Sequence, residues 1–227
     1  MAIVNGNVIG NLSGKLGNLS ARTVDGRTVL AARPSSFNAS QEPAVLAVRQ
    51  KFSVTAKFAS AILSLASLVS IWKKVRNVSS SVFNEVFQSN FAYSSIEKPT
   101  EQNILAPEGF PLQISTAAVA ADKITATLPI LNSSSVFGAD EVNLSANALV
   151  CYYDPSNEAD EPFKIISLSK DVPGYNFAQT NDLEIDLNAT QKNTAAKYQR
   201  SILYVCVVTK TAEGKVVQNS STFTKLS

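Results

Sequence analysis

The 227-residue sequence contains no histidine, only two cysteines, one methionine and one tryptophan. Without histidine, the chain can have no His-dependent catalytic triad and no His metal ligand. It also lacks the residue that usually acts as a general base near neutral pH. Two cysteines are too few for a zinc cluster or a disulfide framework. We therefore expect a protein that is not an enzyme and that binds no metal and no other cofactor.

Charged residues are also sparse. They make up 17% of the chain, whereas hydrophobic residues make up 45%. Disordered chains show the opposite balance, so we expect a packed core. The length is sufficient for two small domains, or for one domain with a substantial extension.

The sequence has no long hydrophobic run. The longest uncharged apolar stretch extends from Phe58 to Trp72, which is fifteen residues, whereas a membrane-spanning helix needs about 20. The first residues have neither the basic region nor the continuous apolar region of a signal peptide. We expect no membrane span, synthesis in the cytoplasm, and reduced thiols at Cys151 and Cys206.

The net charge of +2 conceals an asymmetry along the chain. Residues 1–78 contain ten basic and two acidic residues, a net charge of +8, and the remaining 149 residues carry a net charge of −6. Such halves can attract each other between subunits, or the basic half can bind an anionic partner. Nucleic acid is a possible partner but is not favoured, because aromatic residues that could stack on bases are scarce before Phe37.

Residues 1–40 are expected to form a glycine-rich arm and a β-hairpin. Five of the nine glycines lie in the first 26 residues, interspersed with apolar residues such as Val8, Ile9 and Leu12. This composition indicates an extended arm that becomes ordered against a neighbouring subunit, with a flexible terminus as the alternative. A hairpin is predicted over residues 19–33, because Asp25–Gly26 is a preferred turn dipeptide.

Residues 41–98 are expected to be helical. Ser40 is suited to an N-cap and Pro43 to the first helical position, and apolar residues then recur at steps of three and four. A helix from Pro43 to Arg76 would be about 50 Å long, so it either bends into two helices or packs against partners. A shorter helix is predicted over residues 82–91, after the Ser79–Ser81 cluster.

Residues 99–111 hold three prolines and one glycine and are expected to be a linker. After them the hydrophobic period changes to two, which is typical of strands. Seven or eight short strands separated by turns predict an immunoglobulin-like antiparallel β-sandwich over residues 112–227, and a segment of residues 106–227 is expected to fold alone. The predicted strands cover 112–115, 123–128, 148–153, 163–168, 183–187, 201–208 and 215–218, with a final one at 221–224. The fold class is thus α+β.

Three other patterns have a functional and a simpler interpretation. Gly10–Lys15 is similar to a phosphate-binding loop, but the glycines are one residue too close. The acidic loop Asp154–Glu161 could offer oxygens to Ca²⁺, although a solvated connection between strands is favoured. Cys151 and Cys206 could form an inter-sheet disulfide, but two buried thiols are favoured because the chain shows no export signal.

The segments Gly14–Asn18 (Gly-Lys-Leu-Gly-Asn), Glu42–Phe52, and the strand pair at 149–155 and 203–208 resemble an uncharacterised family. This family is a domain of unknown function that is common in Bacteroidota and in their phage-like elements. The resemblance covers nearly the whole chain and implies no catalytic residues. Family members usually have a tryptophan in the early hairpin, whereas the single tryptophan here is Trp72.

These observations predict a non-enzymatic assembly protein, with a phage virion, as a head or tail component, as the setting that the resemblance implies. Its partners would be further copies of itself or other virion proteins, with no small-molecule substrate. The alternative is a bacterial cell-surface or adhesion module with an immunoglobulin-like domain. The residues expected at the assembly interface are Gly14, Lys15, Gly17, Arg22, Arg27, Phe52, Phe58, Ile62, Leu65 and Trp72.

Overall fold

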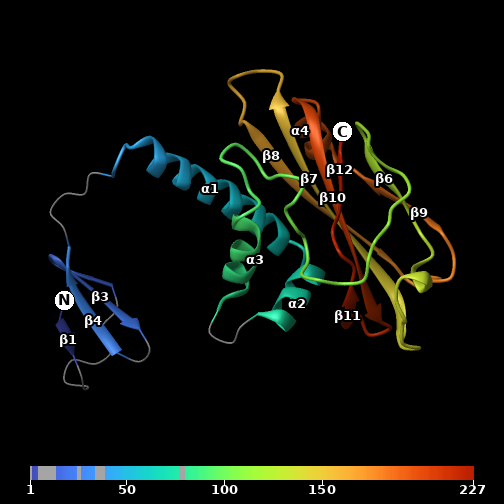
Figure 1. The fold of residues 1–227 in the computed structure, drawn as a ribbon, viewed down its shortest axis with the longest axis horizontal. Coiled ribbons are helices and arrows are strands. Elements are labelled where there is room, and N and C mark those ends of the chain that lie inside the picture. The colour runs from blue at the N-terminus through green and yellow to red at the C-terminus, as the bar shows by residue number, and fades with distance from the viewer. Residues whose placement is uncertain (1, 5–13, 25–26, 34–38, 77–79) are drawn as a thin grey trace. The chain divides into compact units, whose positions relative to one another are not determined.

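The computed structural model describes residues 2–4, 14–24, 27–33, 39–76 and 80–227 (Figure 1). Contacts between residues divide the chain into two compact units, Met1–Val45 and Leu46–Ser227. We call them the N-terminal unit and the main unit. The fold class is α+β, as predicted, with a small antiparallel sheet first, then helices, then further antiparallel sheets.

The N-terminal unit contains a four-stranded antiparallel sheet in the order β1-β4-β3-β2. Its strands are β1 (Ala2–Val4), β2 (Gly14–Leu16), β3 (Leu19–Val24) and β4 (Arg27–Ala32). The predicted hairpin is confirmed, because β3 pairs with β4 over its whole length. Its predicted turn at residues 25–26 and the arm at residues 5–13 lie outside the described residues.

A second hairpin joins β2 to β3 and was not predicted. Only Gly17 and Asn18 separate the paired residues Leu16 and Leu19. Gly17 has a φ of 57°, in the left-handed region that glycine adopts most easily. A Gly-Asn pair between two apolar runs is a recognised hairpin signal.

Three helices follow: α1 (Pro43–Leu63), α2 (Ala66–Val75) and α3 (Val82–Phe91). The long helical stretch bends into two helices, which is one of the two predicted outcomes. The bend between α1 and α2 is 108°. Leu65 lies at the break in an extended conformation. The predicted third helix is confirmed, and the hydroxyl of Ser81 caps it by accepting a hydrogen bond from the backbone N–H of Asn84 at 3.1 Å.

The main unit has two antiparallel sheets. The larger has the strand order β11-β10-β7-β8, and β12 also pairs with β10; the smaller has the order β5-β6-β9. The larger sheet is built from β7 (Glu141–Pro155), β8 (Phe163–Val172), β10 (Tyr198–Thr211), β11 (Val216–Asn219) and β12 (Phe223–Leu226). The smaller sheet is built from β5 (Ala117–Val119), β6 (Lys123–Leu128) and β9 (Asn181–Asp186). A 3₁₀ turn (Leu131–Ser133) and the short helix α4 (Ala189–Ala195) complete the unit.

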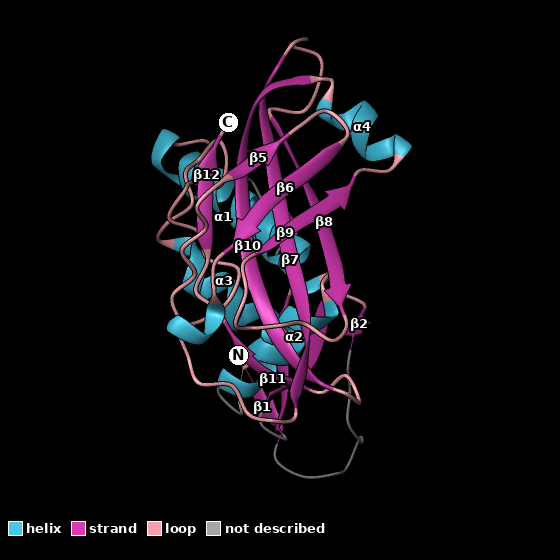
Figure 2. Ribbon diagram, turned by 90° about the vertical axis from the view of Figure 1, so that its right-hand side faces the viewer, coloured by secondary structure: helices cyan, strands magenta, loops and turns pink. Residues whose placement is uncertain are grey.

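The larger sheet separates two hydrophobic cores. Residues of β10 alternate between them: Leu203 and Val205 pack toward the smaller sheet, whereas Ile202 and Tyr204 pack toward the helices. Figures 1 and 2 show α1, α2 and α3 on one side of β10, β7 and β8, and β6 and β9 on the other. The central strands are therefore buried on both faces, and for that reason they contain unbroken hydrophobic runs, residues 148–153 in β7 and 202–208 in β10.

Most of the predicted strands are present, although β7 and β10 extend beyond their predicted bounds. The strand predicted at residues 112–115 is wrong. Leu112 and Ile114 are buried, but the backbone N–H of Leu112 donates to the hydroxyl of Ser221 instead of a neighbouring strand. Helix α4 was not predicted, although Asn188 and Gln191 form the reciprocal capping box that could have indicated it.

The segment predicted as a linker, residues 99–111, contributes to the core beside the helices. Leu105 and Ala106 are buried there, and the indole N–H of Trp72 donates to the carbonyl oxygen of Leu105 at 2.8 Å. The helical segment, the linker and the β segment thus share one core.

Candidate assembly surfaces

The predicted interface residues of the N-terminal unit lie together on its small sheet. Gly14, Lys15, Gly17, Arg22 and Arg27 are all exposed and belong to β2, β3, β4 or the turn between β2 and β3. Gly14 has a φ of 114°, which suits glycine at the start of β2. The cations of this sheet are available to a partner.

Four of the predicted interface residues are core residues instead. Phe58 and Ile62 are fully buried, and Leu65 and Trp72 are 6% and 2% exposed. All four pack with residues of β7 and β10 in the core beside the helices, where the ring of Phe58 meets that of Tyr204 edge-on with centroids 5.2 Å apart. These side chains cover the sheet of their own chain, so they are not available to a partner in this fold.

Phe52 is the predicted helix residue that does lie on the surface, where it is 54% exposed. Its ring centroid lies 4.6 Å from that of Phe87, which stacks in turn on Phe83 and Phe91 along α3. We call these four rings the aromatic row. Lys51 places its ammonium group 5.1 Å from the ring centroid of Phe91. Phe52 is exposed, whereas the three rings of α3 are half-buried. Aromatic side chains at the surface are enriched at protein interfaces, and the i, i+4, i+8 spacing along α3 could have revealed this row.

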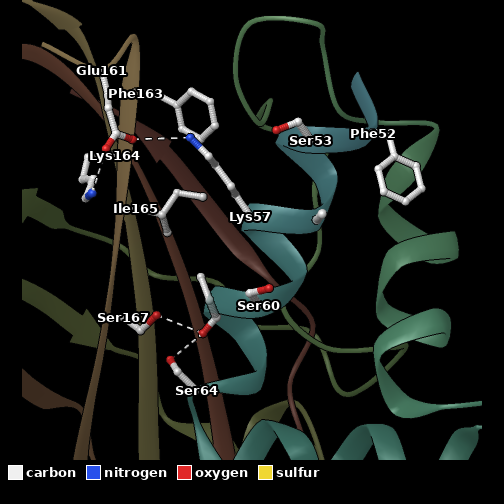
Figure 3. Close-up of a pocket in the computed structure, with 12 residues that line it drawn as sticks. Phe52, Ser53, Lys57, Ser60, Ser64, Glu161, Phe163, Lys164, Ile165 and Ser167 are labelled. Atoms are coloured by element: carbon white, nitrogen blue, oxygen red, sulfur yellow. Dashed lines mark hydrogen bonds and ion pairs between the residues drawn. The ribbon is translucent and has the colours of Figure 1, made fainter. Parts of the chain in front are cut away.

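An open groove of about 920 Å³ lies between α1 and β8 (Figure 3). Phe52, Phe163 and Ile165 supply apolar lining, and Ser60 and Ser64 supply hydroxyls. The hydroxyls of Ser64 and of Ser167, on β8, both donate to the carbonyl oxygen of Ala61, at 2.7 and 2.9 Å. The hydroxyl of Ser167 therefore joins α1 to β8 at the edge of the sheet, whereas that of Ser64 bonds back to the end of α1.

Charged residues line the rim of this groove. Glu161 accepts from the ammonium groups of Lys164 at 3.1 Å and Lys57 at 3.4 Å (Figure 3). These hydrogen bonds, that of Lys164 above all, lower the pKa of the Glu161 carboxyl, so it is ionised at neutral pH. An ionised, paired carboxylate is not suited to general acid catalysis at neutral pH.

A second hollow of about 670 Å³ lies at the acidic loop predicted as a weak calcium candidate. Asp154 has a φ of 61°, and its carboxylate lies 3.6 Å from the guanidinium of Arg200. Asp160 pairs with Lys197 at 2.7 Å. Across the described part of the chain, no group of three or more His, Cys, Asp or Glu side chains could hold a metal ion. Three carboxylates of the loop, Asp154, Asp160 and Glu161, are thus paired with cations of the same chain.

The two cysteines lie on neighbouring strands of one sheet. Cys151 on β7 is paired with Ile202, whereas Cys206 on β10 is paired with Asn147, so they are offset by four residues. Both thiols are free and buried, which confirms the favoured interpretation over an inter-sheet disulfide. Burial raises the pKa of each thiol to about 12.

In the described residues, no individual helix has the length and apolar character to cross a membrane. Only α1 and α2 taken together satisfy those criteria, as a pair bent by 108°.

No family model and no curated protein sequence matches this chain. Two solved structures of beta-glucosidase from Kluyveromyces marxianus, one of them in complex with glucose, are distantly similar in structure. Their sequence identities are 13% and 16%, and the TM-scores are 0.21 and 0.19. Each alignment covers 63% of this chain but 17% of the glucosidase, so this chain spans a small part of that protein's length.

Proposed function

We propose that the protein is a non-enzymatic assembly protein whose N-terminal unit docks on a neighbouring subunit. One observation carries this proposal: among the small-sheet residues whose burial is described (14, 15, 19–23 and 27–32), only Ala21 and Thr28 are buried. A sheet with an apolar face needs a second layer to cover it. The described residues of this unit supply none.

We propose a phage virion as the setting, with the protein as a head or tail component. The resemblance of Gly14–Asn18 and Glu42–Phe52 to a family of Bacteroidota and their phage-like elements supports this setting. In it, residues 112–227 are an immunoglobulin-like β-sandwich displayed on the particle. The aromatic row and the groove beside β8 are further surfaces for virion proteins or for other copies of the chain.

A bacterial cell-surface or adhesion module is the second candidate. The open groove between α1 and β8 favours it, because a surface module needs a site for a ligand in addition to its attachment. The genes beside this one separate the two candidates. Capsid, portal or tail genes would support the virion, and genes for secretion or surface polymers would support the module.

Deletion of residues 1–36 tests the assembly role. We expect the shortened protein to keep the thermal melt of the main unit but to lose self-association, or binding to its partner, in light scattering. A full-length variant with Lys15, Arg22 and Arg27 all changed to Gln is the matched control, because it keeps the sheet but removes its charge. Unchanged association after the deletion would overturn the proposal. Loss of association in both proteins would instead indicate an anionic partner.

A further inference from the structure

The two faces of the N-terminal sheet differ in charge. Successive residues of a strand point to opposite faces, and residues paired across strands share a face. Ala21 pairs with Leu30, and Thr23 pairs with Thr28, so these four residues lie on one face. We call it the uncharged face, and its described positions on β3 and β4 are Leu19, Ala21, Thr23, Thr28, Leu30 and Ala32.

The opposite face carries the cations. Lys15 pairs with Ser20, and Arg22 pairs with Val29, so all four lie on this second face. Arg27 joins them, because it precedes Thr28 by one residue. Each basic residue within β2, β3 and β4 thus lies on the cationic face. Ala21 and Thr28, which are buried, both belong to the uncharged face.

We propose that the uncharged face of one copy packs against the same face of a second copy and closes a two-layer β-sandwich. This inference rests on the proposed function, which assigns assembly to the N-terminal unit, and it names the partner and the surface. A two-fold contact places the same patch on both sides. Here it buries no charge and leaves the cations of both copies on the outside, where water solvates them. Contact through the cationic faces would instead bring like charges together.

Size also favours a second copy as the occupant. Eighteen described residues in the four strands cover about 300 Å² at about 3.4 Å per residue and 4.8 Å between strands. The same sheet from a second copy matches that area and has the same twist, so the two can align face to face. The area is below the roughly 800 Å² that each partner contributes to a standard stable interface. We therefore expect a weak pairing that depends strongly on protein concentration.

Two neighbouring substitutions on opposite faces provide the test in the full-length protein. Leu30→Lys places a charge on the uncharged face, and Val29→Lys adds the same charge to the cationic face one residue away. Both side chains are partly exposed, so they start from similar surroundings. In sedimentation over a concentration series, we expect Leu30→Lys to weaken self-association by about tenfold or more, because the lysine would be buried without a partner. Val29→Lys should be within about twofold of the wild type, as is usual for exposed positions.

A third variant excludes misfolding as the cause. Thr23→Val keeps the branched shape but replaces the hydroxyl on the uncharged face with a methyl group. We expect it to strengthen association by about two- to fourfold, since added apolar area is then buried. A misfolded sheet would not produce this gain.

Every other pattern overturns the pairing. It is wrong if Leu30→Lys associates like the wild type, if Val29→Lys is weakened as much, or if Thr23→Val gives no gain. If deletion of residues 1–36 abolishes association while Leu30→Lys does not, only the face-to-face pairing fails. If the deletion also leaves association intact, the proposed function fails with it.

Discussion

The two units of this chain differ in how their sheets are covered. In the main unit, helices pack on one face of the larger sheet and a smaller sheet packs on the other, so Tyr204 and Leu203 are fully buried on opposite sides of one strand. In the N-terminal sheet, the described residues form one layer, and Leu30 remains partly exposed although it pairs with buried Ala21. The main unit thus covers both faces of its larger sheet with its own elements, whereas we propose that a second copy covers the N-terminal sheet.

The distribution of charge follows the same division. Six ion pairs join described residues of the main unit. Exposed ion pairs of this kind contribute about 0–1 kcal/mol each, so they adjust the fold of the main unit without determining it. On the small sheet, Lys15, Arg22 and Arg27 stand on a single face. The charge asymmetry seen in the sequence is therefore also an asymmetry between the two faces of one sheet.

Thiol reactivity should show the largest difference between the units. Burial raises the pKa of Cys151 and Cys206 to about 12, and only the thiolate reacts. We expect both to react with a thiol reagent at pH 8 only when the main unit unfolds, which slows labelling by a factor of about 10³ or more.

The matched reference for this measurement is Ala31→Cys, which places a third thiol on the partly exposed β4. It should react rapidly in the native protein, and deletion of residues 1–36 should leave the protection of Cys151 and Cys206 unchanged. Rapid native labelling of either buried cysteine would mean that the main unit is not closed as described.

Two phenylalanines on α1 separate core from surface within one helix. Phe58→Ala should destabilise the main unit by about 3–5 kcal/mol, because a fully buried ring is lost and a cavity is left against Tyr204. Phe52→Ala should cost no more than about 1.5 kcal/mol, the range of a single aromatic contact such as that with Phe87. Urea denaturation measures both, and equal losses would contradict the assignment of Phe52 to the surface.

The sequence predicts the elements of this fold better than it predicts what covers them. Residues 123–128 are predicted to the residue as β6, because their alternation matches a half-buried strand. The extension of β7 before residue 148 is missed, because Asn147 and Ser145 indicate a loop. Both are buried in the structure, where Asn147 shares a 2.6 Å hydrogen bond with the hydroxyl of Ser67. A polar residue that finds a distant partner cannot be recognised from neighbouring residues alone.

The candidate interface shows the same limit. The helical spacing of four apolar residues predicts correctly which face is buried; they are Phe58, Ile62, Leu65 and Trp72. This spacing is the same, however, whether the face packs on a sheet of the same chain or on a partner. The structure resolves this, since β7 and β10 occupy that face. Lys15 and Leu30 likewise lie on opposite faces of the small sheet because of the strand register. The alternation of residue types suggests this register, but only the pairing of β2, β3 and β4 establishes it.

The smallest predicted effect concerns the ion pairs on the rim of the groove. The pKa of Glu161 is lowered by hydrogen bonds from Lys164 and Lys57, so its contribution to stability is present above the unfolded-state pKa of about 4.3. That contribution is lost as the pH falls through the lower folded-state pKa. Because the Glu161 side chain is 52% exposed, solvent screening keeps it below about 1 kcal/mol. Glu161→Gln should therefore lower the free energy of unfolding by a few tenths of a kcal/mol at pH 7 in low salt.

Urea denaturation at two pH values and two salt concentrations isolates this contribution. The difference between Glu161→Gln and the wild type should shrink as the pH is lowered through the folded-state pKa of Glu161, and also in 1 M salt, where the Debye length is about 3 Å. Glu158→Gln, which removes the same charge from the same loop, is the control for net charge. A difference that stays constant across pH and salt would show that Glu161 acts through packing. The rim of the groove would then stabilise the main unit through side-chain packing, as its core does, and not through charge interactions.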